Sequence, residues 1–78
     1  MATINGNTPQ PLFTEGQHID ANELNAVIGR EHLAYTQTRS PEFGVLTAVI
    51  ENDNFTYHTR QQWMTNDIVI VKVESKNP

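Results

Sequence analysis

Apolar residues recur with two different periods along the chain. In the first half they lie three or four positions apart, which is the spacing of one face of a helix. The residues of this face are Leu24, Val27, Ile28, Ala34 and Tyr35. The pattern predicts a helix over about residues 20–38.

The beginning of the predicted helix carries its own signals. Asp20 suits the N-cap position, and Glu23 three residues later gives the D-x-x-E form of a capping box. Ile19 and Leu24 have the spacing of a hydrophobic staple, in which apolar residues on either side of the cap pack together. Pro41 cannot continue a helix, so the element is expected to end before it.

In the second half of the chain the period changes to two, which is typical of strands. Three strands are predicted, at about residues 44–51, 55–59 and 67–74. The Asn and Asp residues at 52–54 predict the turn of a hairpin between the first two. The segment around Trp63 fits either a continuation of the second strand or a loop.

The first residues show neither period. They are rich in Pro, Gly and Asn, which favour turns and extended backbone, and Leu12 and Phe13 offer an apolar anchor. We therefore predict an extended arm over residues 1–18 and one small α+β domain over 19–78, in which a helix precedes an antiparallel meander. The sequence leaves open whether the arm packs on its own domain or on a neighbouring subunit.

The size of the chain bears on how it is stabilised. A chain of 78 residues buries a small share of its surface, and such domains compensate with disulfides, metals or oligomerisation. The sequence has no cysteine, and its only soft metal ligands are His18, His32 and His58. We therefore expect oligomerisation, with no metal and no cofactor.

Charge and motifs narrow the function classes. Nine acidic and five basic residues give a net charge of -4, and the basic residues are scattered singly, whereas nucleic-acid binding needs them clustered. No apolar run reaches the length of a membrane span, and the beginning lacks a signal-peptide pattern. No nucleophile elbow, phosphate-binding loop or zinc-protease motif occurs. We expect neither an enzyme nor a partner that is a nucleic acid or a membrane.

Large apolar residues supply the candidates for protein binding. Phe55 and Tyr57 are expected to belong to the core, whereas Trp63 has polar neighbours and is the stronger interface candidate. Residues 68–73 are apolar on both faces, which is typical of a central strand or of an edge covered by another chain. The candidate partner-binding residues are Leu12, Phe13, Trp63 and Ile70.

Residues 13–25 resemble a phrase near the beginning of many phage tail-fibre, baseplate and contractile-injection components. The matching positions are Phe13, Gly16, Gln17, Ile19, Ala21, Leu24 and Asn25. The resemblance ends there, because the Arg- and His-rich helix end of injection-system members is only faintly echoed by Arg30 and His32. In physical terms, Gly16 permits a turn and Gln17 can hydrogen-bond the backbone of that turn.

The resemblance implies a virion or tail structural protein, such as a fibre, baseplate or capsid-decorating adaptor. It would assemble with copies of itself and with a larger structural protein, and would be found in the virion or the host cytoplasm. The alternative is a small phage-type inhibitor that binds a host or defence protein. An assembly protein is stoichiometric in purified particles, whereas an inhibitor is absent from them.

The beginning of the helix can be tested directly. Asp20→Ala should lower the free energy of unfolding by about 1 kcal/mol through the lost cap. Leu24→Ala should lower it by about 2–5 kcal/mol, because a buried leucine leaves a cavity. Denaturant midpoints measure both effects, and midpoints equal to that of the parent chain would refute the capping and staple interpretation.

Overall fold

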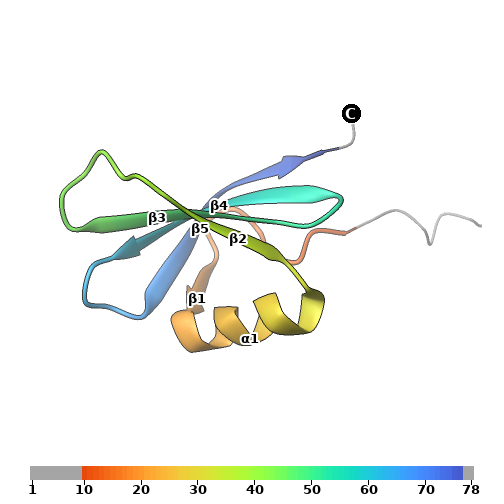
Figure 1. Ribbon diagram of the computed structural model, residues 1–78, viewed down its shortest axis with the longest axis horizontal. Helices are drawn as coiled ribbons and strands as arrows, with labels where there is room; N and C mark the ends of the chain where they lie inside the picture. Colours follow the sequence, from red (N-terminus) through yellow and green to blue (C-terminus); the bar gives the residue numbers. More distant parts are fainter. Residues whose placement is uncertain (1–9, 77–78) are drawn as a thin grey trace, which may run out of the picture.

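A computed structural model of the protein describes residues 10–76 and shows an α+β fold, with one helix against one face of a five-stranded antiparallel sheet (Figure 1). The elements are β1 (His18–Asp20), α1 (Ala21–Glu31), β2 (Ala34–Thr38), β3 (Val45–Glu51), β4 (Phe55–Gln62) and β5 (Asp67–Ser75). Their order across the sheet is β1-β5-β4-β3-β2, so the last four strands form a meander and the first strand closes beside the last.

Strands β3, β4 and β5 confirm the predicted meander. The turn between β3 and β4 has the chemistry that the Asn-rich sequence indicated. The Oδ1 atom of Asn52 accepts hydrogen bonds from the backbone N–H groups of Asn54 and Phe55, at 2.8 and 2.7 Å. This side-chain bonding is an Asx turn, and it reverses the chain without needing glycine. Strand β4 continues beyond the predicted residue 59, as far as Gln62.

The beginning of α1 follows the prediction in most respects. Asp20 is the N-cap in extended backbone, and its carboxylate accepts a hydrogen bond from the Asn22 N–H at 2.9 Å. Ile19 and Leu24 are both buried in the core, as expected of a hydrophobic staple. Among the described hydrogen bonds, none joins Glu23 to the Asp20 backbone, so only the Asp20 half of the capping box is present.

The predicted end of the helix is wrong. Helix α1 ends at Glu31, and His32 caps it with a left-handed backbone, φ 54°. The Leu33 N–H then donates to the Ile28 carbonyl at 3.0 Å, the long-range bond of a Schellman motif, while the Leu33 side chain is buried. Residues 34–38 form β2, because Tyr35, Thr36 and Thr38 favour a strand and the whole segment pairs with β3.

The segment before β1 packs on its own domain. Gly16, at φ 87°, occupies the left-handed position of a turn in which the Gln17 N–H donates to the Thr14 carbonyl at 3.1 Å. Gln17 Oε1 also accepts the Thr14 N–H at 2.9 Å, as the sequence suggested. The Gly16 N–H donates to the Ile70 carbonyl, and the Ile70 N–H donates to the Gln17 carbonyl. These two bonds extend the pairing of β1 with β5.

Tyr57 lies at the centre of the core and is 0% exposed. Phe13 meets its ring edge-on, with centroids 5.1 Å apart, and Phe55 lies 6.1 Å away in a tilted arrangement. The Leu12 N–H donates to the Tyr57 hydroxyl at 2.8 Å. Burial raises the pKa of this phenol, and the Leu12 hydrogen bond opposes the shift. The hydroxyl therefore remains protonated inside the core and fixes the arm to the sheet.

Strand β5 changes which of its side chains face the helix. Ile68 and Ile70 point into the core, but a register shift opposite His58/Thr59 turns the later residues over, so that Val73 packs on the core instead. Val71 is left exposed. Residues 68–73, which the sequence showed to be apolar on both faces, thus belong to an interior strand with a bulge.

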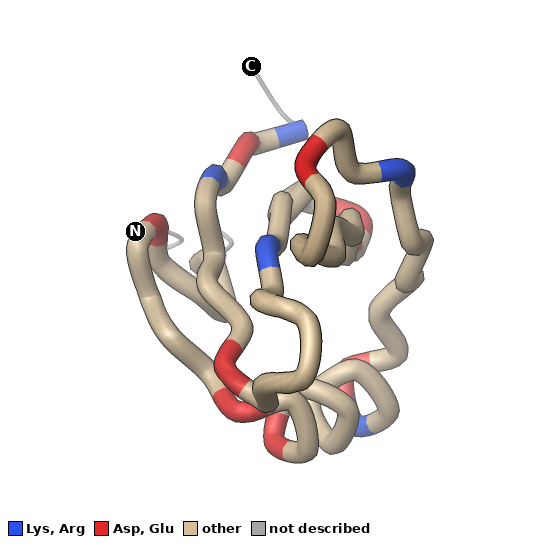
Figure 2. Tube along the Cα trace, turned by 90° about the vertical axis from the view of Figure 1, so that its left-hand side faces the viewer, with Lys and Arg blue, Asp and Glu red and all other residues tan. Residues whose placement is uncertain are grey.

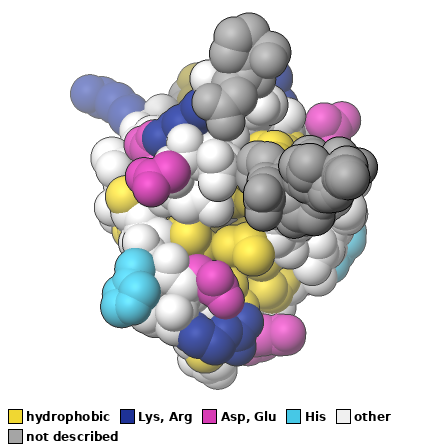
Figure 3. Space-filling model, turned by 90° about the vertical axis from the view of Figure 1, so that its right-hand side faces the viewer, with side chains coloured by type: hydrophobic (Ala, Val, Ile, Leu, Met, Phe, Trp, Pro, Cys, Tyr) yellow, Lys and Arg dark blue, Asp and Glu magenta, His cyan; other side chains and the backbone are white. Residues whose placement is uncertain are grey.

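Some apolar side chains are exposed on the surface. At the end of the molecule that lies to the right in Figure 1, apolar side chains reach the surface among charged ones (Figure 3). Among residues 10–76, no helix is long and apolar enough to cross a membrane.

The arm's contribution to stability can be measured with one variant and a neighbouring control. Phe13→Ala should lower the free energy of unfolding by about 3–5 kcal/mol, because it removes a buried ring from the Tyr57 cluster. Leu12→Ala should cost far less, because its side chain is partly exposed and the substitution keeps the N–H that binds Tyr57. Equal denaturant midpoints for the two variants would contradict this assignment.

Candidate interaction site

The end of the β3–β4 hairpin near Val45 and Gln62 carries several exposed apolar residues. The Trp63 N–H donates to the Gly44 carbonyl at 2.8 Å, which adds one pair to the hairpin beyond Val45 and Gln62. Gly44 has φ 81°, a conformation that side chains rarely adopt, so glycine is needed where the loop enters β3. The backbone of Trp63 is thereby held beside Gly44, and its side chain is largely exposed.

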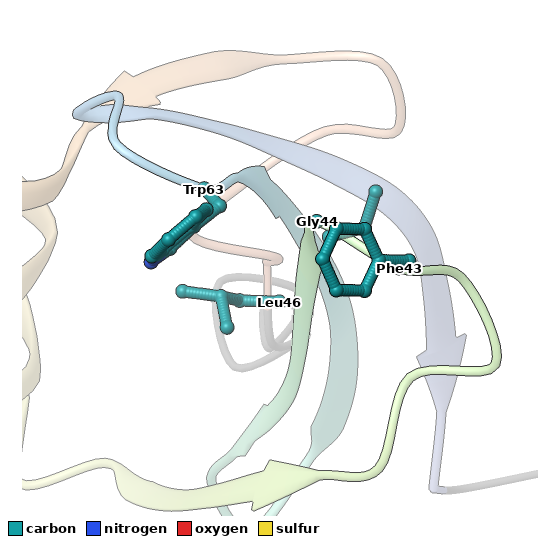
Figure 4. A pocket seen from close by; sticks show the side chains of 5 residues that line it. Phe43, Gly44, Leu46 and Trp63 are labelled. Atoms are coloured by element: carbon teal, nitrogen blue, oxygen red, sulfur yellow. The ribbon is translucent and has the colours of Figure 1, made fainter.

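We define the apolar patch as the exposed residues at this end of the hairpin: Phe43, Leu46, Trp63 and Met64. Phe43 is 100% exposed, Met64 85% and Trp63 59%. Figure 4 shows Trp63, in the turn after β4, on the same side as Leu46 of β3, with Phe43 on the other side of Gly44. Together with Val45, these three residues and Gly44 line a hollow of about 220 Å³.

The backbone at Met64 is strained. Its φ of 69° is a left-handed conformation that costs a residue with a side chain about 1–2 kcal/mol. Glycine or asparagine is the usual choice at such a position. The turn is closed by the Thr65 N–H and hydroxyl, which both donate to the Gln62 carbonyl, at 3.1 and 2.8 Å. The turn thus holds an exposed apolar residue in a left-handed conformation directly after an exposed tryptophan.

The patch lies on the face of the sheet that α1 covers elsewhere. Leu46 pairs with Gln61 in the same alternation that directs Ile50 and Tyr57 into the core. Trp63 continues this alternation beyond Gln61. The helix packs on the central part of the face, so this end receives no cover from it.

The four residues predicted to bind a partner have different places in the structure. Trp63 lies in the apolar patch, and Leu12 is partly exposed beside Tyr57. Phe13 and Ile70 are corrected, because both side chains are inside the chain's own core, at 3% and 0% exposure. Of the two arrangements that the sequence left open for the arm, Phe13 therefore follows the one in which it packs on its own domain. The residues before Gln10, which include the beginning of the predicted arm, lie outside the described residues.

Sequence reasoning missed the other members of the patch. Phe43 and Met64 stand in loops with polar neighbours, and Leu46 fits the pattern of an ordinary strand. The available signal was an aromatic residue directly before a loop glycine, Phe43-Gly44, together with Trp63-Met64 between a polar strand end and a turn. Only the hairpin register brings these two pairs together.

The opposite face of the sheet is polar and carries histidine–carboxylate pairs. His18 Nδ1 lies 2.9 Å from an Asp67 carboxylate oxygen, and His58 Nε2 lies 2.7 Å from one of Glu74. The His58 hydrogen bond, with help from Lys72, lowers the pKa of the Glu74 carboxyl. These groups are solvent-exposed, so they mainly tune the surface charge.

Charged positions are unevenly spread. Lys and Arg stand apart from one another along the trace, whereas several acidic positions gather on the side that carries β1 and α1 (Figure 2). Asp20 lies directly opposite Asp67 in the β1–β5 register. His32 is at the helix end, away from the pairs of His18 and His58. In the part of the chain that the structure describes, no group of three or more His, Asp or Glu residues could hold a metal ion.

Comparisons with protein-family models, with curated proteins and with solved structures found no match for the chain. The apolar patch, the polar face and the sheet edges are therefore the observations from which a function is inferred.

The strain at Met64 can be tested with a substitution that relieves it. Met64→Gly should raise the free energy of unfolding by about 1 kcal/mol, because glycine adopts positive φ without penalty. Met64→Ala is the matched control, since it removes the same apolar surface but keeps a Cβ and hence the strain. A denaturant series in which the glycine variant gains nothing over the alanine variant would contradict the assignment.

Proposed function

We propose that the chain is a non-enzymatic assembly module that binds a larger protein through the apolar patch. The observation that carries this proposal is the cluster of exposed Phe43, Trp63 and Met64 around a shallow hollow. Aromatic residues and methionine are enriched at protein interfaces, and tryptophan is prominent among the residues that dominate binding energy.

The size of the hollow favours a protein over a small molecule. Pockets for drug-sized ligands have volumes of about 300–1,000 Å³ and surround their ligand. The hollow here has about 220 Å³ and its aromatic walls stand out into solvent. It fits one or two side chains of a partner, while Phe43 and Met64 contact the partner around them.

The strain at Met64 supports the same conclusion. A left-handed methionine lowers the stability of a chain whose core is already small. Strained backbone positions are common at functional sites, and an exposed methionine that follows Trp63 in the sequence suits protein binding.

Because residues 13–25 resemble a phrase of tail components, we propose more specifically that the chain is a virion or tail structural protein. Three elements of that phrase have structural roles in this chain: the Gly16 turn, the Gln17 hydrogen bond and the Ile19–Leu24 staple. Residues 13–25 then stabilise the fold, and the apolar patch binds the chain to a larger structural protein. Self-association of the chain, in solution as well as on the particle, is part of the proposal.

The test is incorporation into purified virus particles or tails. The parent chain should be present in stoichiometric amounts, and Trp63→Ser should reduce incorporation at least tenfold while its thermal melt stays close to that of the parent. Val71→Ser is the matched control, because it removes an exposed apolar side chain of β5 that lies outside the apolar patch. Incorporation of the Trp63 variant at the parent level would overturn the docking site. Absence of the parent chain from particles would overturn the virion role and favour the inhibitor.

A further inference from the structure

Strand β2 forms one edge of the sheet and lacks the features that protect such edges. All five of its side chains are exposed, and Ala34–Thr38 contains no charged residue and no proline. Its pairing with β3 is regular over its whole length. Edge strands are normally shielded by charge, proline, a bulge or a covering loop, because their free backbone groups pair with other strands.

The opposite edge of the sheet is protected. Strand β1 has three residues, two of which are His18 and Asp20, and so offers a short and polar template. Beyond it, β5 is irregular at Val71 and carries Lys72 and Glu74. The contrast singles out β2 as the edge available for pairing.

The ladder determines which backbone groups of β2 are free. The bonds from the Asn52 N–H to the Phe55 carbonyl and from the Trp63 N–H to the Gly44 carbonyl bracket the β3–β4 hairpin. Because bonded pairs alternate in antiparallel ladders, even-numbered residues of β3 bond to β4 and odd-numbered ones bond to β2. In β2, Tyr35 and Gln37 therefore direct their N–H and carbonyl groups outward.

We propose that a second copy of this chain pairs with β2 in antiparallel orientation across a two-fold axis at Thr36. Tyr35 then exchanges backbone hydrogen bonds with the partner's Gln37, and Gln37 does so with the partner's Tyr35. Thr36 faces the partner's Thr36 on the polar face of the sheet, and threonine pairs of this kind are favourable across strands. The two sheets join into one continuous sheet, which removes both β2 edges.

Charge complementarity supports a second copy as the occupant. In this register Arg39 lies opposite the partner's Leu33, beside the end of the partner's helix. Among the described residues Arg39 has no ion-pair partner, and its position continues the alternation of Tyr35 and Gln37 on the face that α1 covers. The helix end offers the negative end of the helix dipole and the Glu31 carboxylate. Glu31 Oε2 lies 3.4 Å from Arg30 Nε in an exposed pair, and a carboxylate has two oxygens, so it can also accept from Arg39. The axis repeats this contact, so the pairing closes as a dimer and cannot extend.

This inference rests on the self-association in the proposed function and adds the surface that provides it. The apolar patch and the β2 edge are different surfaces, so loss of one leaves the other intact.

The experiment measures molar mass by light scattering at micromolar concentration for the full chain and for two charge variants. The parent should have the mass of two chains. Thr36→Lys and Thr36→Glu each place like charges face to face on the axis and should weaken the dimer at least tenfold. An equal mixture of the two variants should recover the dimer, because Lys then faces Glu. The Thr36 side chain is exposed, so each variant should keep the circular dichroism of the parent.

A second pair of variants tests the backbone bonds. Gln37→Pro removes an outward N–H and is tolerated on an edge, whereas Gln37→Ala keeps the N–H and serves as the control. Of these two variants, Gln37→Pro should become monomeric and Gln37→Ala should remain a dimer.

A monomeric parent would overturn both this inference and the self-association in the proposed function. A dimeric parent that all four variants leave intact would overturn the β2 pairing alone. Two monomeric charge variants that do not recover on mixing would overturn the two-fold register.

Discussion

The contact between Tyr57 and the arm is the interaction on which the rest of the structure depends. The phenol is buried in the sheet, its hydroxyl accepts the Leu12 N–H, and the Phe13 ring packs edge-on against it. Without this contact the arm would not hold Gly16 and Gln17 beside Ile70, where they begin the pairing of β1 with β5. Helix α1 follows β1 directly, so its position over the sheet is fixed from the same point.

Much of this fold could be predicted from local patterns. The Asp20 cap, the Ile19–Leu24 staple and the Asn52 turn each depend on residues a few positions apart, and their chemistry is visible in the sequence. The end of the helix could not be predicted in the same way. His32 adopts a left-handed conformation that favours glycine or asparagine, and β2 is a strand because β3 lies beside it. Tertiary pairing decided between two periods that the sequence supports equally.

In the candidate site too, some residues could be predicted from the local sequence and others depend on tertiary pairing. Trp63 could be singled out because a large aromatic residue with polar neighbours is unusual, whereas Phe43 and Leu46 join it only through the β3–β4 register. Phe13 and Ile70 were misjudged because apolar character does not tell whether a side chain is buried by its own chain or by another. The bulge in β5 resolves the case of Ile70, since it allows one strand to have two apolar faces in different places.

Both proposed surfaces have one physical origin. Helix α1 has 11 residues and is about 16 Å long at a rise of 1.5 Å per residue. Strands β3, β4 and β5 have seven to nine residues and extend about 23–30 Å, so they are longer than the helix. Five strands about 4.8 Å apart make a sheet about 19 Å wide, which is wider than one helix of about 10 Å. A single short helix therefore covers only the central part of one face, around Ile50 and Tyr57. Leu46 and Trp63 at one end and Tyr35 on the outer strand are left over, so a chain of this size is completed most readily by protein contacts at those two places.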